Sequence, residues 1–169
     1  MATTISPEEL FFGAPTTLTV DGVDVGGTID APKVTITPTV YTPDFQNARG
    51  PIKGTDIVTK VLVAAEFTVN QFTGEKMGWT MPGSETTGQV TTWEPGRIPS
   101  DAYKEVVLIG EGLDGRTMVV AIHDAISVQP LDIDFSSTAI GGMKVRLEGR
   151  YDPDAPTVAP FSIELDLGS

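Results

Sequence analysis

The sequence predicts an all-β domain with one short helix. Eighteen glycines and thirteen prolines divide the 169 residues into short segments. Within these segments apolar and polar residues alternate with the period of two that strands require. Asp-Gly pairs, which favour tight hairpin turns, stand between several of them. We therefore expect a β-sandwich or barrel in a single domain, residues 1–169.

The first elements are predicted to be a hairpin and an edge strand. Residues 17–25, TLTVDGVDV, predict a hairpin that turns at Asp21-Gly22. Residues 33–41, KVTITPTVY, predict a strand with valine, isoleucine and proline on one face and threonines on the other. Pro38 has no N–H to donate, which indicates an unpaired or bulged stretch there.

A long strand and a short helix are predicted next. Residues 55–69 place Val61, Val63, Ala65, Phe67 and Val69 on one apolar side. The helix is expected within residues 70–83, which end in Pro-Gly, and its two internal glycines predict that it is short.

The second half of the chain continues the strand pattern. Residues 105–124 predict a hairpin about Asp114-Gly115. Three further segments alternate apolar with mostly charged residues, which indicates one face on a core and one toward solvent or a partner: 131–135, 143–151 and 161–167. The proline-rich residues 153–160 predict a connector before the last strand.

Composition excludes several classes of function. The absence of cysteine excludes disulfides and thiolate chemistry. The net charge of −12 disfavours a nucleic-acid grip, because such binding depends on lysine and arginine contacts to phosphates. The start of the chain lacks a secretory signal pattern, and no apolar run approaches the roughly 20 residues of a membrane helix. We expect a protein made soluble in a cytoplasm.

No motif predicts catalysis, a metal or a cofactor. GEGLDG at 110–115 has the glycine spacing of a dinucleotide fingerprint, but a β-branched segment follows where a helix is required. His123 is the only histidine, and with no cysteine present it cannot build a usual zinc set. The paired acids lie outside any calcium-loop pattern: Asp132 with Asp134, and Asp152 with Asp154.

The segment TPDFQNARGPIKGTD, residues 42–56, is longer than a hairpin needs. Two to five residues would connect the flanking strands. It carries Gly50, Pro51 and Gly54 together with charges of both signs. Its length predicts either a mobile surface loop or a contact with a partner.

Several stretches, taken in order, resemble the major tail tube protein of long-tailed, siphovirus-like bacteriophages. They are LTVDGVDVGGT, ARGPIKGTD, EFTVNQFTGEKMGWTMPGSE, LIGEGLDGRTMVVAIHDAIS and MKVRLEGRYDPDAPTVAPFSIEL. The resemblance implies a structural virion protein rather than an enzyme, with no cofactor. It implies a β-sandwich with a flanking helix, assembled as hexameric rings that stack into a tube. It also implies location in the virion tail, with tape measure, terminator and baseplate or tip proteins as partners, no membrane, and transient passage of DNA.

The same resemblance assigns roles to parts of the chain. Residues 1–15 would form an N-terminal arm, 42–56 the loop between rings, and 152–169 a connector and final strand. The loop residues expected to contact the next ring are Arg49, Gly50, Pro51, Ile52, Lys53 and Gly54. A bore that passes DNA without binding it should be acidic, and the candidates for its lining are Glu66, Asp132 and Asp134.

The sequence is also compatible with three other functions. Trp79 is expected in the core, whereas Trp93 and Tyr103 would serve a receptor- or carbohydrate-binding sandwich as stacking surfaces. A tail terminator or joining protein would share most of the tube protein's features. A hydrolase that uses paired acids is a third possibility.

Overall fold

The structure is a computed structural model that describes residues 12–28, 30–44, 50–88, 90–112, 116–133 and 141–166, with side chains from Thr17 onward. Within these ranges the elements are β1 Phe12–Val20, β2 Val23–Asp24, β3 Lys33–Tyr41, β4 Ile57–Val69, α1 Gly74–Thr80, β5 Glu85–Thr87, β6 Val90–Thr92, the 3₁₀ turn η1 Ser100–Ala102, β7 Lys104–Gly112, β8 Thr117–Ser127, β9 Met143–Gly149 and β10 Phe161–Asp166. The predicted class, all-β with one short helix, is confirmed.

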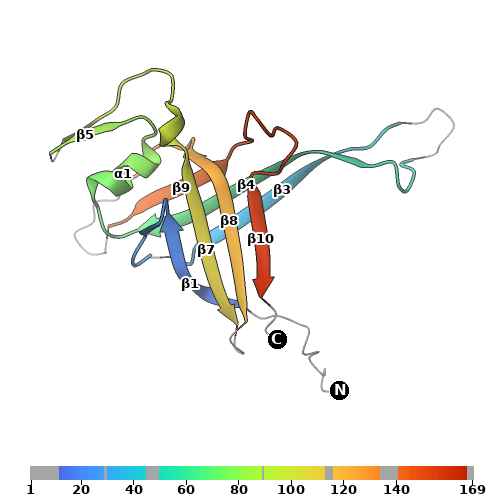
Figure 1. Cartoon of the computed structure of the whole chain (residues 1–169), viewed down its shortest axis with the longest axis horizontal. Helices are drawn as coiled ribbons and strands as arrows, with labels where there is room; N and C mark the ends of the chain where they lie inside the picture. Colours follow the sequence, from blue (N-terminus) through green and yellow to red (C-terminus); the bar gives the residue numbers. More distant parts are fainter. Residues whose placement is uncertain are drawn as a thin grey trace.

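Eight strands form one antiparallel sheet that divides at β8. The strand order is β2-β1-β7-β8-β9-β4-β3, and β5 and β6 form a separate hairpin. The first half of β8 pairs with β10, whereas its last residues, Ala125–Ser127, pair with β9. As a result β1, β7, β8 and β10 cross over β3 and β4 as a second layer (Figure 1). The sheet does not close into a barrel.

The core lies between these two layers. Every second residue of the central strands points into it, as the alternation predicted. The fully buried side chains include Val20, Val63, Val69, Val106, Ile122, Met143, Val145 and Leu147. Trp79 of α1 is buried against one end of this cluster, which confirms its predicted place in the core.

Local turn chemistry explains the first strands. Asp21 and Gly22 both have positive φ, 54° and 76°, as a tight hairpin turn requires, and they join β1 to β2. The bounds of β3 agree with the predicted strand. Pro38 lies on this edge strand, and the register with β4 shifts directly after it, between Thr39 and Val40. The predicted irregularity at the proline is confirmed.

The helix α1 is seven residues long, and its glycines have a structural reason. Thr73 caps its first turn by accepting a hydrogen bond from the Lys76 backbone N–H at 3.2 Å. A Cβ on Gly74 would lie 2.9 Å from the Thr86 side chain, so glycine allows β5 to pack on the helix.

Two predicted boundaries differ from the structure. The strand expected at 131–135 is reduced, in its described part, to one isolated bridge between Ile133 and Met143. Residues 12–15 of the segment expected to form an N-terminal arm belong to β1, which begins at Phe12 and pairs there with Gly112. Residues 1–11 lie outside the described part. None of the described helices has the length and hydropathy to cross a bilayer.

Gly149 is closely packed against core side chains. A Cβ on this residue would lie 2.7 Å from Val63 Cγ1 and 3.0 Å from Ile122 Cγ2. Gly149→Ala should therefore lower the free energy of unfolding by about 1–3 kcal/mol, the usual cost of overpacking. Urea denaturation measures the change. Gly96→Ala is the matched control, since no atom lies within 4 Å of the added Cβ, and equal stability of the two variants would contradict the packing argument.

Candidate functional site

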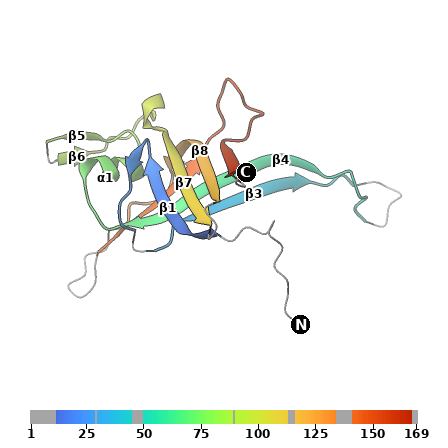
Figure 2. The same cartoon turned by 60° about the horizontal axis from the view of Figure 1, so that its bottom comes forward.

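The strands β3 and β4 extend beyond the rest of the sheet as a two-stranded ribbon. β9 accompanies β4 only from Ala64 to Val69, so the first half of β4 pairs with β3 alone. Figures 1 and 2 show the ribbon projecting away from the body of the molecule. We define the ribbon as residues 36–41 and 57–62. Its base is held by Tyr151, whose hydroxyl accepts from the Val61 N–H at 2.9 Å and donates to the Val61 carbonyl at 3.2 Å.

Both faces of the ribbon expose large apolar side chains. These are Ile36, Val40, Tyr41, Ile57, Val58 and Leu62. An isolated two-stranded hairpin is at best marginally stable in water. Exposed apolar patches on a folded protein mark surfaces that a partner covers. The ribbon is therefore the clearest candidate interaction surface in the described part of the chain.

One face of the ribbon continues the protein's own core. Ile36 pairs with Val63 and Val40 with Val58, so these residues share the face that the core of the sandwich uses. Val63 is 1% exposed, whereas Val58, farther along the same strand, is 57% exposed. The apolar stripe thus runs on past the point where the second layer of the same chain stops covering it.

β10 leaves a second apolar row uncovered. Ile163 and Leu165 pair with Val120 and Met118, so they lie on the core-facing side of the strand. They are nevertheless 46% and 52% exposed. The predicted strand at 161–167 is confirmed in its described part, but its apolar face packs on the core only at Phe161.

The free edges of the sheet accompany these uncovered faces. Among the described strands, β3 and β10 each have a strand neighbour on one side only. An edge strand presents unpaired backbone N–H and C=O groups, which are suited to pairing with another chain. Uncovered apolar faces and open edges thus occur together on one side of the sandwich.

The loop from 42 to 56 joins the two strands of the ribbon at its outer end. Its bounds agree with the predicted segment. The Thr42 hydroxyl donates to Asp56 Oδ1 at 2.6 Å and closes its base. On the β4 side of the loop, Thr55 donates to the Ile52 carbonyl through its N–H at 3.3 Å and its hydroxyl at 2.8 Å. The turn between them uses the positive φ of Gly54, 89°.

The loop residues predicted to meet a partner are accessible where they are described. Gly50, Pro51, Ile52, Lys53 and Gly54 are all exposed. Arg49 lies outside the described residues. The structure thus places the described part of the predicted contact loop at the end of the ribbon, free of the body of the same chain.

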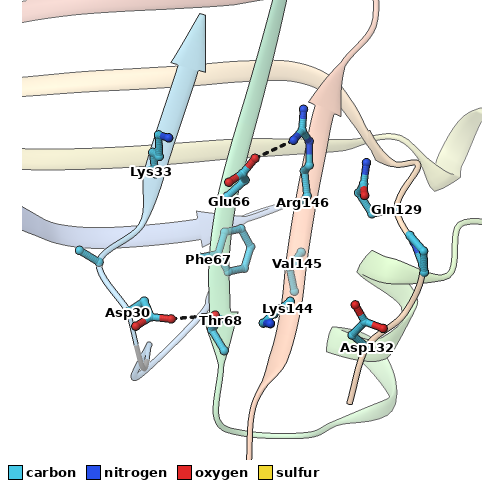
Figure 3. Close-up of a pocket in the computed structure, with 12 residues that line it drawn as sticks. Asp30, Lys33, Glu66, Phe67, Thr68, Gln129, Asp132, Lys144, Val145 and Arg146 are labelled. Carbon is cyan, nitrogen blue, oxygen red and sulfur yellow. Dashed lines mark hydrogen bonds and ion pairs between the residues drawn. The ribbon is translucent and has the colours of Figure 1, made fainter. Parts of the chain in front are cut away.

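Two of the three predicted lumen residues lie on one face of the sheet. Glu66 on β4 and Asp132, before the isolated bridge at Ile133, line a groove of about 420 Å³ (Figure 3). Glu66 Oε1 lies 2.8 Å from Arg146 Nη1, a cross-strand ion pair between β4 and β9. Arg146 also lies 3.3 Å from Glu148. Asp134 lies outside the described residues.

The charges around this groove are balanced. Three carboxylates and three cations line it: Asp30, Glu66 and Asp132 with Lys33, Lys144 and Arg146. Sequence alternation placed the acids on a polar face but did not reveal the cations opposite them. The register between β4 and β9 is needed for that, because it sets Arg146 beside Glu66. As the structure describes it, this surface is polar without an excess of negative charge.

The lone histidine sits at the surface. His123 Nδ1 lies 3.4 Å from Glu105 Oε1, and both side chains are about half exposed. No group of three or more histidine, aspartate or glutamate residues within the described ranges could hold a metal ion.

Trp93 forms the wall of a separate surface groove. Its Nε1 donates to the Pro82 carbonyl at 3.1 Å, which fixes the ring, yet the residue is 54% exposed. The groove, about 440 Å³, also includes Glu94 and Arg97. Tyr103 is partly buried and lines the adjoining groove with Arg97. The two predicted stacking residues are thus brought near one segment of chain but not into one groove.

Comparison with known proteins does not identify a family for this chain. The chain matches no model of a protein family, and a search of curated proteins finds no relative.

The ribbon's exposed valines should contribute little to the stability of the monomer. We predict that Val40→Thr combined with Val58→Thr changes the free energy of unfolding by less than about 1 kcal/mol, because both are exposed and threonine suits strands. Val63→Thr, a buried change on the same face of β4, should cost about 1–3 kcal/mol because it buries a hydroxyl. Urea denaturation of dilute protein compares them. If the double variant lost as much free energy of unfolding as Val63→Thr, the ribbon would have to be covered within one chain.

Proposed function

We propose that the protein is a self-assembling structural subunit, the tail tube protein of a siphovirus-like bacteriophage. In this proposal the subunits form hexameric rings, and the rings stack into a tube through which genomic DNA is ejected. The observation that carries the proposal is the ribbon, a projecting pair of strands with apolar side chains uncovered on both faces. The resemblance of the ordered sequence stretches supplies the family.

The physical reason is that the exposed surfaces are complete only against another copy. Edge strands and apolar faces on one side of the sandwich suit contacts around a ring, where each subunit covers its neighbour. The ribbon and its loop project from the body and suit a contact with the next ring. A contact between two different surfaces of the same protein closes into a ring where its rotation closes, and it propagates where it does not, so a contact of this kind between stacked rings extends into a tube.

Charge supports the role of a conduit. The chain as a whole carries 23 acids and 11 bases, which disfavours binding of phosphates, while the described groove at Glu66 has three carboxylates and three cations. We place the face that carries Glu66 and Asp132 on the bore, together with Asp134. On this face the guanidinium of Arg146 lies between Glu66 and Glu148, so it is already engaged by carboxylates. Passing DNA would then meet a polar but unreceptive surface.

A tail terminator or joining protein is the nearest structural alternative, since it would form one ring with similar contacts. Copy number in purified particles separates the two. A tube protein is present in many rings, and a terminator in one.

Electron microscopy of the purified protein over a concentration series tests the proposal. Rings or tubes should appear as the concentration rises, alone or with tail partners that nucleate them. The Val40→Thr and Val58→Thr double variant should assemble only at higher concentration. Protein that stays monomeric in every condition, partners included, would overturn the proposal.

Shortening the loop should separate folding from assembly. Replacing Gly50-Pro51-Ile52 by Asn-Gly should leave the monomer folded, because the loop makes its described hydrogen bonds within itself and at its base. Tube formation should stop, since the projecting contact is lost. Circular dichroism checks the fold and microscopy checks the tubes; tubes of normal length would remove the loop from the contact between rings.

A second candidate function, glycan binding, is favoured by one observation, the fixed and exposed ring of Trp93. A rigid aromatic face beside Glu94 and Arg97 suits stacking of a sugar with polar contacts at its rim. A glycan array with the wild type and Trp93→Ala tests it. Binding that the substitution abolishes would favour an adhesin module, and an array without signal would remove this candidate.

A further inference from the structure

We propose that the groove beside α1 is the receptor for residues 50–54, the described part of the contact loop, of a second copy of this chain. This inference rests on the proposed function and deepens it, because it names the surface that receives the projecting loop. It is carried by the shape and charge of the groove, the opposite charge of the loop, and their positions at opposite ends of the molecule.

The groove lies between α1, the turn that follows it, and the segment around η1. Its volume is about 800 Å³. Gly74 and Gly78 on α1 and Gly83 after it have no side chains to fill it. Pro99 and Ala102 line the groove on the side of η1. It is therefore a groove whose lining is partly apolar.

Carboxylates dominate the rim of this groove. The charged lining residues are Asp21, Glu75, Glu85 and Asp101 against one cation, Lys104. That cation is already engaged, since its Nζ lies 3.0 Å from Asp21 Oδ2 and 3.0 Å from the Asp101 carbonyl. Glu75, Glu85 and Asp101 are exposed, so their three charges face solvent without a cation of the groove beside them. A cationic ligand would be held here and a phosphate would be repelled.

The centre of the loop carries the opposite charge, although the loop as a whole is neutral. Residues 45–55, FQNARGPIKGT, contain Arg49 and Lys53, and the two acids of the loop, Asp44 and Asp56, flank this stretch. Lys53 is exposed, and Ile52 beside it presents an apolar side chain to solvent. An apolar contact in the groove with cations at its acidic rim is the usual arrangement of a specific protein contact.

The positions of the two surfaces require a second copy. The ribbon that carries the loop points away from one end of the longest axis, and α1 with β5 and β6 lies at the other end (Figures 1 and 2). The loop of one chain therefore cannot occupy its own groove. Head-to-tail docking leaves an unused loop at one end and an unused groove at the other, so each added copy creates the site for the next.

Thiol cross-linking tests this contact directly, because the chain has no cysteine of its own. We combine Gly50→Cys, where a Cβ meets no atom within 4 Å, with Ser84→Cys in the groove, and treat concentrated protein with a short bis-maleimide. The expected result is a ladder of covalent multimers on a denaturing gel. The matched control joins Gly50→Cys to Gln129→Cys, an exposed site on the other groove, and should give no ladder.

Charge reversal supplies the second arm. Lys53→Glu and Glu85→Lys should each raise the protein concentration needed for assembly by about tenfold or more, and the two together should restore much of it, because like charges at a contact are strongly unfavourable. Two results would contradict docking in this groove and leave the proposed function standing. One is the formation of tubes without a cross-linked ladder, and the other is tube assembly at an unchanged protein concentration in both single charge-reversal variants. A ladder without tubes would support the groove and overturn the tube. Neither ladder nor tubes would overturn both.

Discussion

The divergence of the two layers at β8 is the constraint on which the rest of the structure depends. One strand cannot pair with β9 and β10 along the same side at the same residues, so β8 gives its first half to β10 and its end to β9. β4 therefore has β9 beside it only from Ala64 to Val69. Before Ala64, β3 and β4 continue as a pair without a third strand. The apolar alternation that builds the core continues into this region, because it belongs to the strand and not to the layer that covers it. Uncovered apolar faces are thus a consequence of the topology.

Charge is distributed to match this geometry. On the face formed by β4 and β9, acids and bases alternate across the strands, and ion pairs such as Glu66 with Arg146 hold the register at little net charge. Such half-exposed pairs contribute at most about 1 kcal/mol each, so their value lies more in specifying alignment than in stability. Carboxylates gather around α1, whereas the described part of the loop at residues 50–54 carries the cation Lys53. These opposite charges suit a contact between the two ends of successive copies.

The sequence was informative wherever structure is set by neighbours along the chain. The Asp21-Gly22 turn, the bounds of β3, the irregularity beside Pro38, the loop from 42 to 56 and the burial of Trp79 all follow from local pattern or turn chemistry. What could not be predicted depends on strands distant in sequence. The exposure of Leu165 reflects where β3 and β4 lie, and the balance of charge around Glu66 reflects the register with β9. The same limit explains the strand expected at 131–135, whose alternation finds one bridge partner in its described part.

A subunit with open edges and apolar faces must also avoid associating in the wrong way, and the ribbon contains devices for this. Pro38 removes one N–H from the β3 ladder, and the register shift after it disturbs the strand, so the edge is a poor template for indefinite strand addition. The net charge of −12 keeps free copies apart at low concentration. The remaining productive contacts are those in which side-chain faces and opposite charges fit together. The open edge and the exposed apolar faces of the ribbon would promote aggregation in an isolated protein. Here the proline and the net charge restrict them to contacts with a correctly oriented neighbour.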